Sequence, residues 1–261
     1  MSFDRTKLGT SDLEKYFHNN ERRLIHKWNH YFDIYERHFN RFRNRPIVIL
    51  EIGVFHGGSL QMWKDYFGNK VQIHGVDINP DCKKLEEDQV QIHIGSQTDR
   101  AFLRKLKEQI PKVDILIDDG GHTMKQQQTT FEELYDHVKE DGVYLCEDTH
   151  SSYWIEYGGG LKRRKTFMEF SKNLIDSLNA FHSRQGSFKP DSFTKSADSI
   201  HFYDSIVVIE KRKRTAPIDL KSGEESFPYD YHHNGSKTKY RILLSINKVL
   251  QFLRLPGFIW R

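Results

Sequence analysis

The chain has 261 residues, of which 37% are hydrophobic and 13% aromatic, a composition that excludes disordered, collagen-like and low-complexity proteins. Its 40 basic and 36 acidic side chains give a formal net charge of +4, which argues against a dedicated nucleic-acid binder. Two cysteines without zinc spacing, short apolar runs and no apolar signal segment indicate a soluble cytoplasmic protein without a disulfide scaffold or a transmembrane helix.

Residues 1–46 are predicted to form an amphipathic helical extension. Apolar side chains recur there at helical spacing among many charged ones: Leu13, Tyr16, Phe17, Leu24, Trp28, Tyr31, Phe32, Ile34 and Tyr35. Pro46 ends the region just before a predicted strand.

Residues 47–214 alternate between short apolar runs and helical stretches. The runs cover residues 47–52, 71–76, 90–94, 113–117 and 143–146. Helical stripes lie between them: Phe102, Leu103, Leu106 and Ile110, then Phe131, Leu134, Tyr135 and Val138. Because buried strands that alternate with helices form parallel sheets, we predict an α/β domain with a Rossmann-like, doubly wound, mostly parallel sheet. Residues 200–203 and 206–211 predict an antiparallel hairpin that completes seven strands.

Residues 215–261 are predicted to be a polar loop followed by a basic amphipathic helix from Tyr240 to Leu255. The helix has one apolar stripe: Ile242, Ile246, Val249, Leu250 and Leu253. We prefer packing of this stripe against the domain or a second subunit, in a homo-oligomer, with a membrane-surface helix as the alternative. Residues 201–261 hold 11 Lys or Arg and 6 Asp or Glu, so the positive charge gathers in this region and indicates an anionic partner or a subunit contact.

A glycine-rich turn follows the first predicted strand. It reads Glu51-Ile52-Gly53-Val54-Phe55-His56-Gly57-Gly58-Ser59, and its glycines permit close backbone approach to a ligand. Asp77 ends the next strand, where an acidic side chain can accept both hydroxyls of a ribose. The spacing is not that of G-x-G-x-x-G, and a simple tight turn is the alternative. Together with Asp77, the turn indicates a nucleoside-bearing ligand.

Four carboxylates follow two later strands. The fourth strand ends in Ile117-Asp118-Asp119-Gly120-Gly121-His122 and the fifth in Cys146-Glu147-Asp148-Thr149-His150. If these strands are neighbours, their carboxyl ends bring the four acids to one edge of the sheet, which favours a bound hard cation, Mg²⁺, Mn²⁺ or Ca²⁺, over zinc. The alternative is that the acids cap turns and helices. His122 is the candidate general base beside such a site.

These motifs resemble those of the macrocin and mycinamicin sugar O-methyltransferases over roughly residues 47–210, and residues 7–10 are also similar. The resemblance is carried by the turn at residues 51–59, by Gly75-Val76-Asp77-Ile78, and by the Asp-Asp-Gly-x-His and Glu-Asp-Thr motifs in that order. Cephalosporin-hydroxylase-like proteins share much of this pattern, so it indicates the superfamily better than the substrate.

The resemblance implies a class I enzyme that uses S-adenosylmethionine and Mg²⁺, with Mn²⁺ as a substitute. It implies metal ligands at Asp119, Glu147 and Asp148 and a general base at His122. It also implies the following residues around S-adenosylmethionine: Glu51, Gly53, Ser59, Asp77, Ser96, Gln97 and Asp118. The expected acceptor is a small-molecule sugar or nucleotide sugar, and we expect no nucleic-acid partner.

The segment after the fifth strand holds the candidate substrate contacts. Tyr153 and Tyr157 lie in an aromatic, glycine-containing stretch that predicts either a lid or a surface loop. Arg163 and Arg164 follow in a basic run that is either solvated or a contact for acceptor phosphates. Two other functions stay open at this point, a metal-dependent hydrolase and a non-catalytic nucleotide-binding scaffold.

Overall fold

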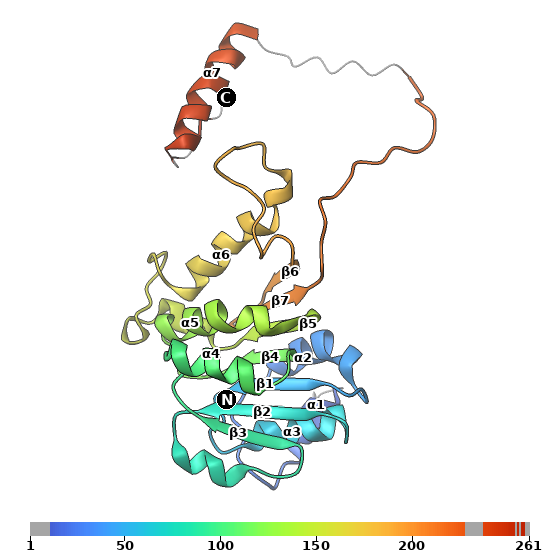
Figure 1. Ribbon diagram of the computed structural model, residues 1–261, viewed down its shortest axis with the longest axis vertical. Coiled ribbons are helices and arrows are strands. Elements are labelled where there is room, and N and C mark those ends of the chain that lie inside the picture. The colour runs from blue at the N-terminus through green and yellow to red at the C-terminus, as the bar shows by residue number, and fades with distance from the viewer. Residues whose placement is uncertain (1–10, 228–236, 254, 256, 259–261) are drawn as a thin grey trace, which may run out of the picture.

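The computed structural model describes residues 11–227, 237–253, 255, 257 and 258. Its seven strands form one sheet in the order β3-β2-β1-β4-β5-β7-β6 (Figure 1). They are β1 (Val48–Ile52), β2 (Gln72–Asp77), β3 (Val90–Ile94), β4 (Val113–Asp118), β5 (Val138–Cys146), β6 (Ala197–Phe202) and β7 (Val207–Lys211). The first five are parallel, and β7 runs antiparallel to both β5 and β6. The predicted Rossmann-like fold and its closing hairpin are confirmed.

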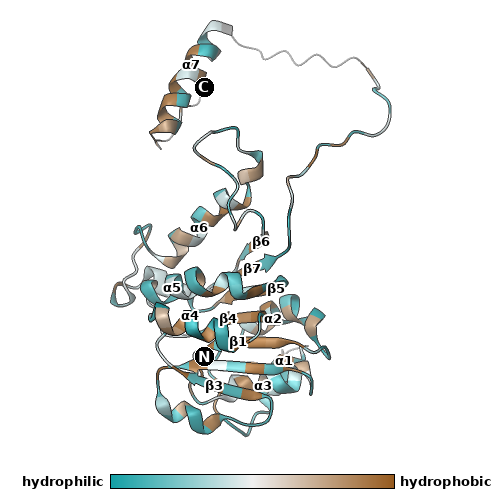
Figure 2. Ribbon diagram, in the orientation of Figure 1, coloured by the Kyte–Doolittle hydropathy of each residue, from teal (hydrophilic) through white to brown (hydrophobic). Residues whose placement is uncertain are grey.

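Six helices cover the two faces of the sheet. The apolar side chains of α1 (Asp12–His18), α2 (Tyr31–Phe39) and α3 (Gly58–Phe67) pack with one face. Those of α4 (Arg100–Gln109), α5 (Met124–Leu134) and α6 (Phe167–Leu178) pack with the other. Figure 2 shows the apolar residues of β1 and β4 between these layers. Burial on both faces explains why β1 and β4 are mostly apolar.

The strand order places the functional motifs. Parallel pairing of β1 with β4, and of β4 with β5, brings the carboxyl ends of all three strands to one edge. β2 ends beside β1 at the same edge, so Asp77 also reaches it. The chain order reverses between β1 and β4, and open α/β sheets bind ligands at such a switch point.

Two expectations about helices were wrong in detail. Residues 19–30 are not helical: α1 ends at His18, and the Asn20 side chain donates to the Arg23 carbonyl within an irregular segment. Val138 does not continue the helical stripe of α5 but begins β5, because a short 3-10 turn at residues 135–137 reverses the chain first. Residues 7–10, which resemble the family, lie outside the described part.

The C-terminal helix α7 (Lys237–Phe252) begins three residues earlier than predicted and stands apart from the sheet (Figure 1). The loop predicted before it is described only up to residue 227, where it carries no helix or strand. No helix among the described residues is long and apolar enough to cross a membrane. The division into residues 1–46, 47–214 and 215–261 stays a prediction, although α2 shares the core of the sheet.

Candidate functional site

A cleft of about 290 Å³ opens over the carboxyl ends of β1 and β2. Five of the residues predicted around S-adenosylmethionine line it: Gly53, Ser59, Asp77, Ser96 and Gln97. The irregular segment at residues 24–27 forms another wall, and Asp119 lies at one end of the cleft. The cleft is therefore built from the N-terminal extension and from four strand ends.

Glycine is required where the cleft meets β4. Gly53 has φ +97°, and a Cβ atom there would lie 2.0 Å from the Asp119 carbonyl oxygen. A Cβ on Gly120 would lie 2.1 Å from the Gln97 side-chain oxygen. Because Gly53 carries no side chain, its loop approaches the backbone of Asp119 closely enough to place Asp119 next to the cleft.

Asp77 is held in place by three backbone N–H groups. Its Oδ2 accepts from Val54 and Phe55 at 2.9 and 3.0 Å, and its Oδ1 accepts from Asn79 at 2.8 Å. Carboxylate oxygens can each accept more than one hydrogen bond, so lone pairs stay available to ligand hydroxyls. The side chain fits the ribose-binding role predicted for it.

Two other predicted cofactor residues do not line the cleft. Asp118 is buried below it, where it accepts from Gln97 at 3.0 Å and from the Tyr144 hydroxyl at 3.4 Å. Glu51 is also buried and accepts from the Trp63 indole at 3.1 Å. Burial raises the pKa of each carboxyl to about 7. Both groups support the floor of the cleft from beneath.

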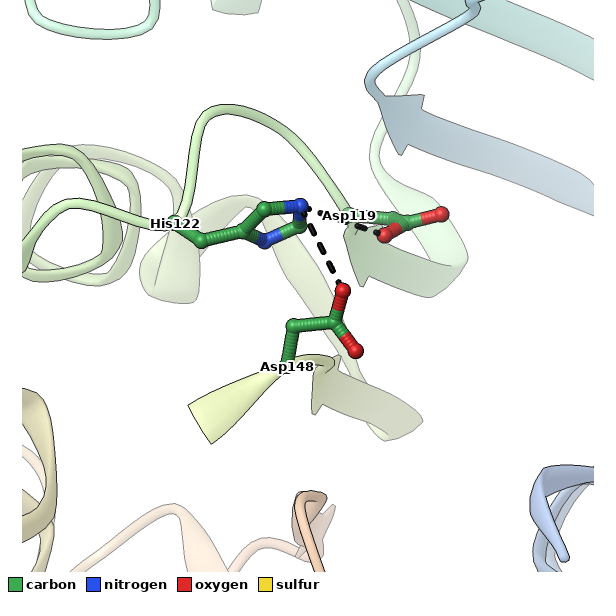
Figure 3. A group of neighbouring side chains, drawn as sticks. All are labelled: Asp119, His122 and Asp148. Atoms are coloured by element: carbon green, nitrogen blue, oxygen red, sulfur yellow. Dashed lines mark ion pairs between the residues drawn. The ribbon is translucent and has the colours of Figure 1, made fainter. Parts of the chain in front are cut away.

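Asp119, His122 and Asp148 converge beside the carboxyl ends of β4 and β5 (Figure 3). One ligand atom from each lies within 4.8 Å of the other two. His122 Nε2 lies 3.8 Å from Asp119 Oδ1 and 3.5 Å from Asp148 Oδ2, while its Nδ1 is buried without a hydrogen-bond partner among the described residues. The two carboxylates fit a divalent cation, and the imidazole lies beside them.

Backbone geometry aims these side chains. His122 has φ +57° and Asp148 has φ +51°, so both occupy the left-handed region. Thr123 then begins α5 with a capping box, in which its hydroxyl and the Gln126 side chain satisfy each other's backbone N–H groups. The sharp turn between β4 and α5 therefore points His122 back toward the ends of β4 and β5.

The fourth predicted acid, Glu147, is engaged by the N-terminal segment. Its Oε2 lies 2.7 Å from Lys27 Nζ, and its Oε1 accepts from the Tyr35 hydroxyl at 2.7 Å. Lys27 also contacts Asp119, and its side chain is only 3% exposed. Burial raises the pKa of Glu147 to about 8, an effect that Asp119 reinforces and Lys27 opposes. Lys27 thus supplies one positive charge inside the acidic cluster.

Tyr31 contacts the remaining acid. Its hydroxyl donates to Asp148 Oδ1 at 2.6 Å and lies 2.8 Å from the Ser205 hydroxyl. Sequence reasoning missed Lys27, Tyr31 and Tyr35 as site residues. The two tyrosines have the four-residue spacing of an apolar helical stripe, and nothing in the sequence distinguishes Lys27 from the charged residues around it.

The candidate substrate residues do not line the cleft. Tyr153 is 48% exposed and lies in a 3-10 turn that follows β5, and Tyr157 ends a second turn. Arg163 donates to the Gly159 carbonyl at 3.2 Å, and Arg164 is exposed. The segment nevertheless starts beside the site, because Ser151 donates to the His122 carbonyl at 2.7 Å. Their contact with an acceptor stays a prediction.

Comparison with known proteins identifies the domain. Residues 50–149 match a family described as a methyltransferase domain. A tetracenomycin-C rhamnosyl 3'-O-methyltransferase from Streptomyces olivaceus is 35% identical over 199 residues, which cover 72% of this chain and 50% of the relative. Mycinamicin VI 2''-O-methyltransferase from Micromonospora griseorubida is 33% identical over 190 residues, which cover 68% of this chain and 47% of the relative. Residues 50–149 therefore form a methyltransferase domain, and the chain is similar over about 200 residues to sugar O-methyltransferases.

A solved methyltransferase structure is also similar to this chain. The methyltransferase MycE, in complex with Mg, S-adenosylhomocysteine (SAH) and mycinamycin VI, is 29% identical and superimposes with a TM-score of 0.69. The match covers 85% of this chain and 57% of MycE. The chain thus spans about half the length of the curated relatives it matches.

Proposed function

We propose that this protein is a Mg²⁺-dependent O-methyltransferase that moves a methyl group from S-adenosylmethionine to a sugar hydroxyl. The single observation that carries the proposal is that the nucleoside cleft and the acidic cluster share a residue. Asp119 belongs both to the cleft beside Asp77 and to the cluster with His122 and Asp148. A nucleoside-bearing methyl donor and a cation-bound acceptor would therefore meet at one residue.

The cofactors supply part of the chemistry when they are bound: S-adenosylmethionine brings the sulfonium methyl, and Mg²⁺ orients the acceptor hydroxyl and lowers its pKa. Asp119 and Asp148 would hold the cation, with Glu147 as the third predicted ligand. Glu147 would fill that role once its contact with Lys27 loosens, since Lys27 and Tyr35 now engage its two oxygens.

His122 would take the hydroxyl proton at Nε2, the nitrogen that faces both carboxylates. Asp119 and Asp148 would partly offset the positive charge that forms on its ring. Asp77 would hold the ribose and thereby fix the direction from which the methyl is presented. Alignment of the two reactants supplies much of the acceleration in such a transfer.

The acceptor class is part of the proposal. The relatives named above act on glycosylated natural products, which favours a sugar hydroxyl in a glycosylated natural product, a nucleotide sugar or a polysaccharide precursor. A metal-dependent hydrolase would not need the nucleoside cleft, and a non-catalytic scaffold would not need His122. The cytoplasmic location and the homo-oligomeric state stay predictions.

The test is a methyl-transfer screen. Purified protein is incubated with methyl-labelled S-adenosylmethionine, Mg²⁺ and a panel of nucleotide sugars and glycosylated natural products. We expect label in at least one sugar and none in the matching acceptor without free hydroxyls. Tight SAH binding without transfer to any acceptor would favour the scaffold, and hydrolysis without SAH binding would favour the hydrolase.

A further inference from the structure

The C-terminal helix α7 carries an uncovered apolar stripe. Ile242, Ile246, Val249 and Leu253 follow one another at spacings of four, three and four residues, so they share one side of the helix. Their exposed fractions are 56%, 44%, 59% and 56%. Figure 2 shows apolar and polar residues alternating along α7, which lies apart from the sheet. Such a face on a short helix normally has a partner.

Leu243 and Leu250 widen the stripe on one flank, as expected from their positions one residue after Ile242 and Val249. The apolar arc is therefore broader than the two-position seam of a coiled coil. It also covers only about two heptads, which is short for a stable helix pair. Leu244 and Phe252 lie outside the stripe.

The charge of the segment has a single sign. Residues 237–261 contain six Lys or Arg and no Asp or Glu. Arg241 and Lys248 lie seven residues apart on the side opposite Ile246, and both are exposed. A second copy of the helix would offer these cations no acidic partner. An anionic surface would attract them all.

We propose that α7 lies on an anionic lipid bilayer, with its apolar stripe in the headgroup region, and docks the enzyme there. Charge complementarity and the width of the stripe both favour this occupant over a second copy of the chain. Basic amphipathic helices bind membrane surfaces through buried apolar area together with attraction to anionic headgroups. The sequence also places Phe258 and Trp260 near the end of the chain, and aromatic residues favour the interface.

Vesicle co-flotation of the full chain tests the proposal. The probes are vesicles of phosphatidylcholine alone and vesicles that also contain phosphatidylglycerol. We expect at least about tenfold tighter binding to the anionic vesicles, weakened by added salt because the attraction is electrostatic. Equal binding to both vesicle types, or binding to neither, would overturn the proposal.

A matched pair of variants separates the stripe from the overall charge. Ile246→Glu and Gln251→Glu change the net charge equally, but Gln251 lies on the polar side and is exposed. We expect Ile246→Glu to abolish flotation and Gln251→Glu to leave most of it. Equal flotation of the two variants would contradict a membrane-facing stripe. A wild-type dimer in solution that only Ile246→Glu dissociates, with no vesicle binding, would assign the stripe to a second copy.

The melting temperatures of Ile246→Glu and Gln251→Glu check that the sheet domain stays folded. Because α7 stands apart from the sheet, both should keep the melting temperature of the wild type. Reversal of two charges, Arg241→Glu with Lys248→Glu, should remove the preference for phosphatidylglycerol. If that double variant still prefers the anionic vesicles, the basic side of α7 is not the contact.

Discussion

The Lys27 ammonium group lies 2.7 Å from Glu147 in a buried ion pair that joins the N-terminal extension to the end of β5. It also contacts Asp119, so one cation neutralises part of an acidic cluster built from two strand ends. Burial of such carboxylates is costly without compensating charge. The irregular segment at residues 19–30 therefore has an electrostatic role at the site as well as forming a wall of the cleft.

Replacement of Lys27 by methionine tests that role. Removal of one partner from a buried ion pair leaves the other uncompensated, so we expect the free energy of unfolding to fall by about 3 kcal/mol. Mg²⁺ should then stabilise Lys27→Met more than it stabilises the wild type, because the cation takes over part of the lost compensation. Denaturant unfolding with and without Mg²⁺ measures both effects. The exposed Lys105→Met is the control, and wild-type stability of Lys27→Met would contradict the account.

His122→Asn tests the general base. Asparagine tolerates the left-handed backbone of residue 122, so the fold should survive the change. We expect turnover to fall by about 10²- to 10⁴-fold, the usual contribution of general base catalysis. SAH affinity, measured by calorimetry, should stay close to that of the wild type. The exposed His182→Asn is the control, and an active His122→Asn would remove His122 from the mechanism.

Asp77→Asn tests the nucleoside cleft. The amide nitrogen cannot accept hydrogen bonds, so the variant loses acceptor capacity toward the ribose and toward the Val54 and Phe55 N–H groups. Loss of a charged hydrogen bond predicts SAH binding weaker by roughly tenfold or more. Asp81→Asn, whose side chain is 71% exposed, should bind SAH normally. Unchanged affinity in Asp77→Asn would mean that the nucleoside lies elsewhere.

His74 predicts a pH-dependent stability. Burial lowers the pKa of His74 to about 4, with smaller contributions from the charges of His93 and His137. The unfolded chain, with a histidine pKa near 6.5, binds more protons between those values. Stability from this group is complete above about pH 6.5 and falls as the pH drops toward 4. His74→Gln should reduce the change in melting temperature between pH 6.5 and 4, and the exposed His182→Gln should leave that change as in the wild type.

Equal pH profiles of stability for His74→Gln and the wild type between pH 6.5 and 4 would contradict a neutral, buried His74. The measurement compares variants at each pH, so the titration of surface carboxylates cancels. His74 Nδ1 and His93 Nε2 lie 3.1 Å apart, a hydrogen bond in which the accepting ring must be neutral. Protonation of the accepting ring breaks that hydrogen bond.

The sheet could be predicted because its strands are buried on both faces. The mostly apolar runs at residues 47–52 and 113–117 are short and are separated by helical stripes, which indicates buried strands. The acids at residues 118–119 and 147–148 could then be placed at one edge from the strand order alone. Their convergence with His122 follows from the turn between β4 and α5.

The other half of the site could not be predicted from local pattern. Tyr31 and Tyr35 are buried, as their apolar spacing indicates, yet their hydroxyls meet Asp148 and Glu147 only after the chain has folded. Lys27 acquires its role through contacts with residues about one hundred positions away. The apolar periodicity predicts which side chains are buried. It does not predict which residues of a distant strand their polar atoms contact.

The central claim is that a bound divalent cation and the nucleoside cleft act together in methyl transfer. The most direct measurement is transfer of labelled methyl from S-adenosylmethionine to an acceptor sugar, after treatment with EDTA and again after Mg²⁺ is restored. We predict that transfer disappears in EDTA and returns with Mg²⁺, while SAH still binds the treated enzyme. Full transfer in EDTA would contradict the claim.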